Sequence, residues 1–182
     1  MRAALLSLAL ALALPAEAAG QSSAAAPLEP PDAPVAVLSV ALYNAQANVQ
    51  EPTDTARAVL ASSVLGSKLA ELLPGQLAAG AADSASRRGP ACQAVVACAR
   101  EVAEAAGTRW VVLAKVSKTS KLIWLFTGQL VHVPSGRIVL DDSTELKGEP
   151  DAMVRAGTRI FAERVARTVK AGGVTTNFPN QP

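Results

Sequence analysis

The sequence Thr108-Arg-Trp-Val-Val-Leu-Ala-Lys-Val116 is followed by Leu122-Ile-Trp-Leu-Phe126 and then by Arg137-Ile-Val-Leu-Asp141. β-Branched and aromatic residues make up much of these three segments, which include both tryptophans of the chain, Trp110 and Trp124. Such side chains favour strands because they pack well on a pleated surface. Polar turns separate the segments, so the sequence predicts three consecutive strands that form a meander.

The positions of apolar residues indicate where each strand lies in the sheet. Leu122 to His132 has apolar side chains on both faces, which predicts a central strand. In the last segment Arg137, Asp141 and Glu145 share one face, which predicts an edge or half-exposed antiparallel strand. The short loop Val133 to Gly136 places glycine where a hairpin needs a positive φ.

Apolar residues at helical spacing predict three helices outside these strands. The first begins at Thr53 or Asp54 and ends before Pro74. The second covers residues 91–106 and the third covers residues 151–170. Pro150 suits the first turn of the last helix, because proline has no N–H to donate there.

Two further segments complete the predicted domain. Pro34 to Tyr43 is a nearly continuous apolar run, which predicts a first strand covered on both faces. Gln76 to Gly89 is rich in alanine and glycine, which disfavour strands, so we expect a weak strand or a loop. The fold class is therefore α/β (α+β): one domain over residues 34–171, with a mixed sheet of four to five strands, a C-terminal antiparallel meander and about three helices.

The N-terminus has the features of a secretory signal peptide. Arg2 is followed by an apolar segment, and Ala16-Glu-Ala18 is a cleavage signal of small residues, so residues 1–18 are expected to be removed near Ala18. Residues 19–33 read as a disordered Ala/Ser/Pro linker, and residues 172–182 as a flexible tail. We expect no transmembrane segment after cleavage and a periplasmic or secreted protein. The formal net charge of +2 gives no indication of nucleic-acid binding.

Cys92 and Cys98 are the only two cysteines. In an exported protein, an isolated pair is expected to form a disulfide. Six residues of regular helix would separate their Cα atoms by about 9 Å, which is too far for the bond. Cys92 must therefore precede the helix if the disulfide forms. A thiol-redox pair is the alternative, although the spacing is not that of thioredoxin.

A cluster of basic residues gives the one candidate contact surface. Lys115, Lys118 and Lys121 surround the first hairpin turn, and Arg109 precedes the same strand. These side chains could contact a partner, or they could keep one end of the sheet soluble and prevent strand addition.

Signals for catalysis or cofactor binding are weak. His132 could approach Asp141 and Asp142 across the last hairpin, which leaves a metal or acid-base site open as a hypothesis. Serine-hydrolase, phosphate-loop and dinucleotide motifs do not occur in the sequence. We therefore assign no catalytic residue, metal or cofactor.

Several motifs carry a resemblance to known families. They are the Cys-x5-Cys segment that starts at Cys92, the run Ala106-Gly-Thr-Arg-Trp-Val-Val-Leu-Ala-Lys-Val-Ser-Lys118, and Pro134-Ser-Gly-Arg-Ile-Val139. In these features the chain resembles small secreted bacterial families of unknown function. More distantly, it is similar to the N-terminal domain of TolB and to envelope domains of curli-secretion and penicillin-binding-protein-activator lipoproteins. The resemblance implies a periplasmic, non-enzymatic accessory or assembly domain without catalytic residues.

Three hypotheses about function follow. The favoured one is an exported, non-enzymatic module that binds an envelope protein partner. The second is a carrier or sensor that binds a small ligand between the sheet and the helices. The third is an enzyme centred on His132 or a thiol-redox protein that uses Cys92 and Cys98.

Overall fold

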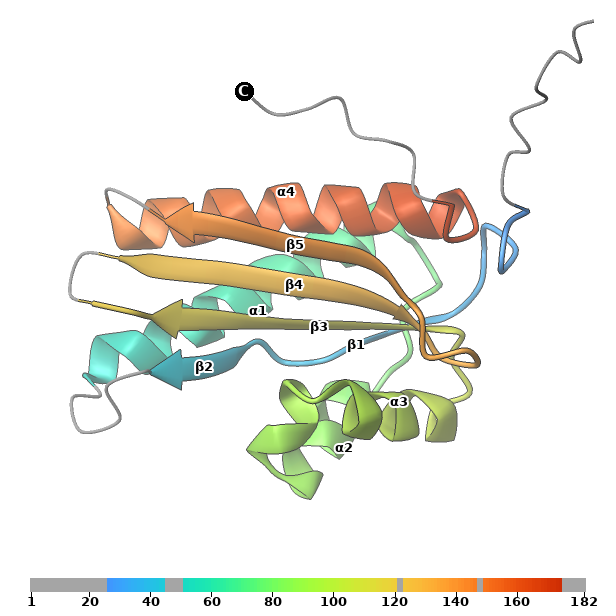
Figure 1. Ribbon diagram of the computed structural model, residues 1–182, viewed down its shortest axis with the longest axis horizontal. Helices are drawn as coiled ribbons and strands as arrows, with labels where there is room; N and C mark the ends of the chain where they lie inside the picture. The colour runs from blue at the N-terminus through green and yellow to red at the C-terminus, as the bar shows by residue number, and fades with distance from the viewer. Residues whose placement is uncertain (1–25, 45–50, 121–122, 147–148, 175–182) are drawn as a thin grey trace, which may run out of the picture.

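The computed structural model describes residues 26–44, 51–120, 123–146 and 149–174. Within these ranges the chain forms five strands, four α-helices and one short 3-10 helix (Figure 1). The strands are β1 (Val35–Val37), β2 (Ala41–Asn44), β3 (Trp110–Lys118), β4 (Trp124–His132) and β5 (Ile138–Leu146). The helices are α1 (Pro52–Leu72), α2 (Ala81–Arg88), α3 (Val96–Ala105) and α4 (Pro150–Lys170), and the 3-10 helix is η1 (Pro90–Gln93).

The five strands form one mixed sheet. Its order is β1-β3-β4-β5, and β2 also pairs with β3, beyond the end of β1. Both β1 and β2 run parallel to β3, whereas β3, β4 and β5 form an antiparallel meander. The predicted single α/β domain with a mixed sheet and a C-terminal meander is confirmed, with four helices where about three were expected.

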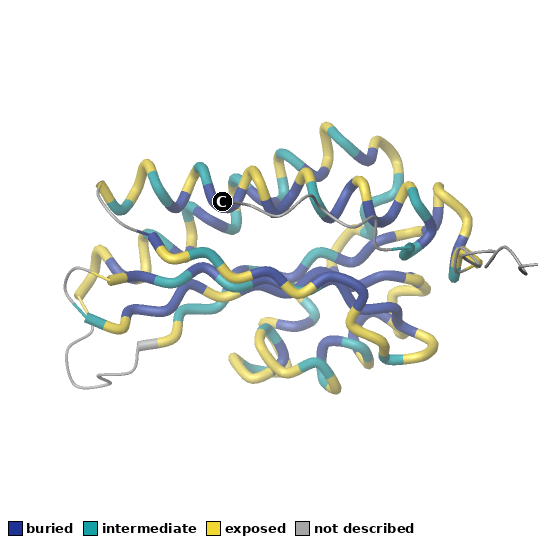
Figure 2. Tube along the Cα trace, turned by 45° about the horizontal axis from the view of Figure 1, so that its top comes forward, coloured by how far each residue is buried: buried dark blue, intermediate teal, exposed yellow. Residues whose placement is uncertain are grey.

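One face of the sheet is covered by α1 and α4, which pack against each other (Figures 1 and 2). The largest side chains of this core are Trp110, Trp124, Phe126 and Phe161, and each is at most 2% exposed. The rings of Phe126 and Phe161 meet edge to face, with 5.5 Å between their centroids. A Cβ atom at Gly128 would overlap the Phe161 ring. Glycine at this point of β4 therefore lets α4 approach the sheet closely.

The opposite face is covered over only part of its length. The two helices on this side, α2 and α3, pack over the region of Val111, Leu113 and Val131. Figure 2 shows that they lie beneath one part of the sheet and leave the other part bare. The sheet is thus one side of a complete layer with α1 and α4, and it carries a partial third layer on its other side.

Helix α2 was not expected from the sequence. The prediction of a weak strand or loop for residues 76–89 is wrong over Ala81–Arg88, which is helical. The only strand-like pairing is a parallel bridge between Leu77 and Val35. Alanine is the best helix former, and Ala81 and Ala85 bury one face of the helix. The same alanines made the segment a poor strand.

The predicted first strand is interrupted at Leu38 to Val40. From Val37 to Ala41 the chain advances four residues, while the register on β3 advances three. The extra residue is a bulge, which bends the strand. The N–H of Val40 donates instead to Ser62 Oγ in α1, at 2.8 Å. This bond explains how the bulge keeps its donor satisfied.

The domain begins earlier than the predicted boundary at residue 34. The N–H of Leu28 donates to the Gly172 carbonyl at 2.7 Å, and Glu29 is 9% exposed. Residues 26–33, expected as the end of a disordered linker, therefore pack against the domain. The predicted signal peptide, residues 1–18, lies outside the described residues, as do residues 175–182 of the predicted tail.

Candidate open-face binding site

We call the part of the sheet that α2 and α3 leave uncovered the open face. Side chains alternate between the two faces of a strand, so every second residue of β2 to β5 points away from α1 and α4. The open face consists of Ala41, Tyr43, Lys115, Ser117, Leu125, Thr127, Gln129, Asp141, Ser143 and Glu145. Most of these residues are polar, unlike the residues beneath α1 and α4.

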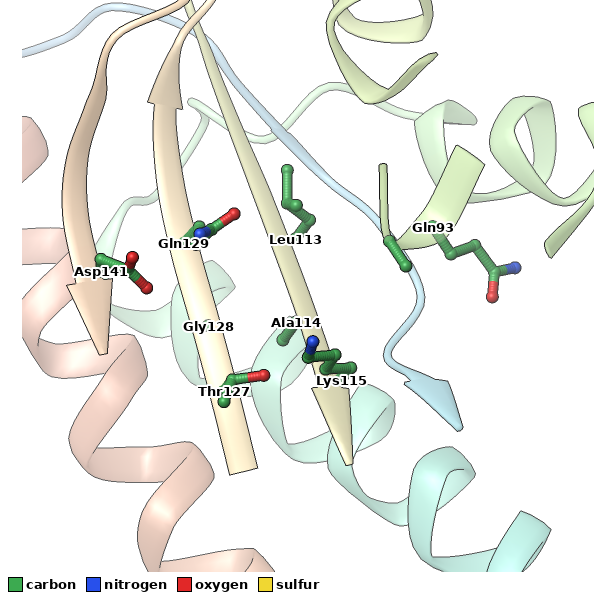
Figure 3. A pocket seen from close by; sticks show the side chains of 9 residues that line it. Gln93, Leu113, Ala114, Lys115, Thr127, Gly128, Gln129 and Asp141 are labelled. Carbon is green, nitrogen blue, oxygen red and sulfur yellow. The ribbon is translucent and has the colours of Figure 1, made fainter. Parts of the chain in front are cut away.

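A shallow hollow of about 160 Å³ lies where the open face meets η1. Four polar residues of the sheet line it, namely Lys115, Thr127, Gln129 and Asp141, and Gln93 of η1 closes one side. In Figure 3 the Asp141 carboxylate points from β5 toward β4, and the side chains of Gln129 and Thr127 point from β4 toward β3. Polar groups from three strands therefore gather over β4.

These side chains have no partner among the described residues. Lys115 and Asp141 are exposed and form no hydrogen bond or ion pair within the described part of the chain. The Thr127 hydroxyl oxygen is buried and has no hydrogen-bond partner. A buried hydroxyl without a partner costs about 1–3 kcal/mol. The arrangement is one that an external ligand with its own donors and acceptors would satisfy.

The register fixes the spacing of the two charges. Thr127 is paired with Lys115, and Gln129 is paired with Asp141. Lys115 and Asp141 are therefore two strands apart across the sheet and two residues apart along it. From the ordinary strand spacing and rise, their Cα atoms are roughly 12 Å apart. A positive and a negative group thus stand on either side of Thr127 and Gln129.

The four residues predicted as a contact surface do not form one surface. Lys115 lies on the open face. Lys118 points to the other face of the sheet and is 7% exposed. Arg109 lies at the opposite end of β3, where its guanidinium Nε donates to Glu29 at 2.8 Å. Lys121 lies outside the described residues.

Lys118 belongs to a buried cluster near the start of α1. Its ammonium donates to both carboxylate oxygens of Asp54, at 3.0 and 3.1 Å. The Asp54 side chain is fully buried, and it also accepts from the Glu51 N–H at 3.0 Å, as a capping residue. Arg57 and Lys118 both lie over the Trp124 ring, at 4.6 and 5.6 Å from its centroid. The cluster joins α1 to the end of the sheet.

His132 does not approach the two aspartates. Asp141 lies on the open face, whereas Asp142 accepts from Arg164 at 2.7 Å on the α4 side. The His132 ring instead has its Nε2 at 2.8 Å from Glu29 Oε1 and its Nδ1 at 2.8 Å from Ser135 Oγ. The hypothesis of a site made of His132 and the aspartate pair is therefore wrong.

Glu29 is the centre of that network. The hydrogen bond from Arg109 holds the pKa of the Glu29 carboxyl below its usual value of 4.5, and His132 lowers it further, while burial works in the opposite direction. The bond to Glu29 in turn raises the pKa of Arg109. The His132 ring also packs against Trp110, with 5.0 Å between the ring centroids. The network attaches the N-terminal segment to the sheet, far from the open face.

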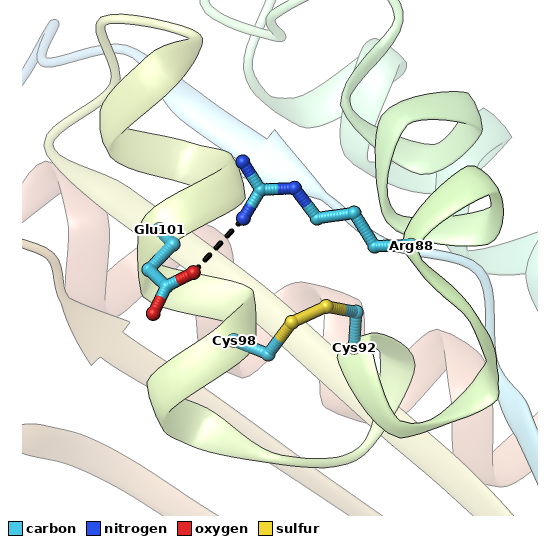
Figure 4. Close-up of a disulfide and its surroundings, with 4 residues drawn as sticks. All are labelled: Arg88, Cys92, Cys98 and Glu101. Carbon is cyan, nitrogen blue, oxygen red and sulfur yellow. Dashed lines mark hydrogen bonds and ion pairs between the residues drawn. A yellow bond between two sulfur atoms is a disulfide. The ribbon is translucent and has the colours of Figure 1, made fainter.

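Cys92 and Cys98 form a disulfide, with Cα atoms 4.8 Å apart (Figure 4). Cys92 lies in η1, before α3 begins at Val96, as the geometric argument from the sequence required. Cys92 is 1% exposed and belongs to the core beneath α2 and α3. Nearby, Arg88 of α2 and Glu101 of α3 form an ion pair at 2.9 Å. Both contacts hold the partial layer together.

Within the described ranges, no group of three or more His, Cys, Asp or Glu side chains is placed to hold a metal ion. The same part of the chain contains no helix long and apolar enough to cross a membrane.

Sequence reasoning did not identify Thr127 or Gln129 as site residues, and it used Asp141 only with His132. The alternation of polar and apolar residues in β4 was a usable signal, because Thr127 and Gln129 share a face that is apolar at Leu125 and Val131. What the sequence did not contain was the extent of the α2 and α3 layer, which decides where that face is covered.

The sequence was compared with families and with solved structures. Residues 33–165 match the family DUF3280, described as "Protein of unknown function (DUF2380)". No protein with curated annotation matches the chain. The predicted resemblance to bacterial families of unknown function and, distantly, to TolB is confirmed at the level of family and fold.

Three solved structures illustrate the similarity of fold. The LpoB C-terminal domain from Salmonella enterica is 14% identical, with a TM-score of 0.47 over 64% of this chain and 84% of that one. Lipoprotein GNA1162 from Neisseria meningitidis is 13% identical, with a TM-score of 0.48 over 75% of this chain and 98% of that one. TolB from Acinetobacter baumannii is 17% identical, with a TM-score of 0.41 over 75% of this chain and 28% of that one.

Proposed function

We propose that this chain, which belongs to the DUF3280 family, is an exported, non-enzymatic module that binds a protein partner through the open face. One observation carries the proposal. Lys115, Thr127, Gln129 and Asp141 gather in a hollow of about 160 Å³ on a bare part of the sheet, and their side chains have no partners in the described part of the chain.

The chemistry of these groups supports binding. They are an ammonium group, a hydroxyl, an amide and a carboxylate, and neither a histidine nor a thiol lines the hollow. Such a set forms hydrogen bonds and ion pairs. The histidine and the two cysteines are used elsewhere, in the Glu29 network and in the disulfide. These contacts support a structural role for His132, Cys92 and Cys98.

Two features support export. Residues 1–18 have the pattern of a secretory signal peptide. The disulfide between Cys92 and Cys98 is of the kind that persists in oxidising compartments such as the periplasm. An envelope protein is therefore the expected class of partner.

A small-ligand carrier is the less well supported alternative. Pockets for small molecules usually enclose about 300–1,000 Å³ and bury most of the ligand. The hollow on the open face has about 160 Å³ and is shallow. A ligand of ordinary size would remain largely exposed to solvent there, so a partner that spreads over the whole open face fits better.

Site-specific photocrosslinking in producing cells tests the proposal. A benzoylphenylalanine replaces Ser143, which is exposed on the open face, and a control variant carries it at Val59, which is 63% exposed on α1. We expect one protein adduct, identified by mass spectrometry, from the Ser143 position and not from Val59. The purified partner should then bind the wild-type chain more tightly than a Lys115→Glu variant. Adducts of equal yield at both positions, or at neither, would contradict the proposal.

A further inference from the structure

We infer that the partner segment on the open face is an extended peptide that carries one acidic and one basic side chain four residues apart. This inference rests on the proposed function and specifies the chemistry of its partner. Three observations lead to it: the area of the open face, the spacing of Lys115 and Asp141, and the unpaired groups between them.

The open face is too small to hold a folded partner by itself. Four strands, β2 to β5, cross it, and it extends over about four residues from Leu113 to Ser117. Strand spacing and rise give roughly 14 by 13 Å, or about 200–300 Å² with the side chains. Stable interfaces between folded proteins bury about 800 Å² on each partner. The same shortage of area argues against a second copy of this chain, whereas a peptide of five extended residues spans about 13 Å.

The charges set the spacing within that peptide. Lys115 and Asp141 have Cα atoms roughly 12 Å apart, and neither has a partner in the described part of the chain. In an extended peptide, residues i and i+4 point to the same side and lie about 13 Å apart. An acidic residue at one of these positions would pair with Lys115, and a basic residue at the other would pair with Asp141.

The groups between the charges suit a peptide backbone. The Thr127 hydroxyl is buried without a partner, and the Gln129 amide offers both a donor and an acceptor. A peptide that crosses β4 between Lys115 and Asp141 would bring its own N–H and C=O groups over these two side chains (Figure 3). Small side chains at the three central positions would let the backbone approach the sheet.

The probe is the synthetic peptide acetyl-Ser-Asp-Ser-Ala-Ser-Lys-Ser-amide, together with the same peptide in the opposite charge order. Two further peptides carry Asp at both positions or Lys at both. Binding to the mature chain is followed by NMR chemical shifts at low ionic strength, because so small a contact gives weak affinity. We expect one or both mixed-charge peptides to shift the resonances of Lys115, Thr127, Gln129 and Asp141, and to bind at least fivefold more tightly than either like-charge peptide.

Charge-reversal variants make the test specific. Lys115→Glu and Asp141→Lys should each weaken the preferred mixed-charge peptide about tenfold, because each creates a repulsion in place of an ion pair. The double variant should recover binding to at least one of the two charge orders to within about threefold, because its charges are complementary in the reverse direction. Arg155→Glu, a matched reversal on the exposed side of α4, should change nothing.

The Thr127→Val variant checks the central contact. It removes the hydroxyl at nearly constant volume, so it should weaken the mixed-charge peptide without lowering stability. Thr158→Val is its control, because the Thr158 hydroxyl is also buried without a partner but belongs to α4. Equal binding of like-charge and mixed-charge peptides, or failure of the double variant to recover, would overturn the inference. A protein adduct at Ser143 with no peptide binding would overturn the inference but leave the proposed function standing; loss of both would reject both.

Discussion

Replacement of Asp54 by alanine should destabilise the domain by about 3 kcal/mol. The Asp54 side chain is fully buried and accepts two hydrogen bonds from Lys118 Nζ, at 3.0 and 3.1 Å. Without Asp54, the Lys118 ammonium would remain in a site where its side chain is 8% exposed. Removal of one partner of a buried ion pair costs about 3–5 kcal/mol, because the other charge is left uncompensated.

The structure places the expected loss at the lower end of that range. Glu51 lies 3.5 Å from Lys118 Nζ and would keep part of the electrostatic attraction. The Trp124 ring, whose centroid is 5.6 Å from the ammonium, would add a cation–π contact of about 0.5–1 kcal/mol. The N–H of Glu51 would lose its acceptor, but it lies at the exposed start of α1, where water can replace the carboxylate.

Urea unfolding of the mature chain measures the difference. The control is Asp151→Ala: Asp151 accepts from Arg57 at 3.2 Å, but its side chain is 60% exposed, so its loss should cost less than 1 kcal/mol. An Asp54→Leu, Lys118→Met double variant should recover most of the stability, because apolar residues can replace a buried pair. A loss below about 1 kcal/mol for Asp54→Ala would refute the assignment of Lys118 as a buried, paired cation.

Three further predictions concern other contacts. The hydrogen bond from Arg109 lowers the pKa of Glu29, so its stabilising contribution is fully present above about pH 4.5 and is lost as the pH falls through the folded-state pKa; the stability difference between wild type and Glu29→Gln, measured by urea unfolding from about pH 3 to 7, should shrink only at the acidic end. Loss of the disulfide in a Cys92→Ser, Cys98→Ser variant should cost about 2 kcal/mol, as expected for so short a loop, and an unchanged unfolding midpoint would contradict this. Gly128→Ala should destabilise by about 1–3 kcal/mol, because its Cβ overlaps the Phe161 ring, and calorimetry that shows no change would count against the close packing of α4.

The meander could be predicted because its signal is local. The segments of β3, β4 and β5 are rich in β-branched and aromatic residues, and polar turns separate them. Their side chains alternate in the way that a central strand and an edge strand require. The disulfide followed from equally local geometry, because a spacing of six residues forced Cys92 out of the helix.

The parts that were missed depend on contacts between distant residues. Glu29 lies in a segment of low hydrophobicity, and only the approach of Arg109 and His132, 80 and 103 residues away in sequence, makes it part of the core. Lys118 looked like a surface charge because Asp54, its partner, is 64 residues away. In the same way, the sequence of β4 shows two faces but not which part of one face α2 and α3 cover.

The central claim is that the open face is where a partner binds, and hydrogen exchange of the chain with and without its photocrosslinked partner tests it most directly. The measurement compares the amides of residues 113–117, 125–129 and 141–145, on the open face, with those of α1. We predict slower exchange in the three open-face segments and unchanged exchange in α1. Protection confined to α1 or α4, with the open-face segments unchanged, would contradict the account.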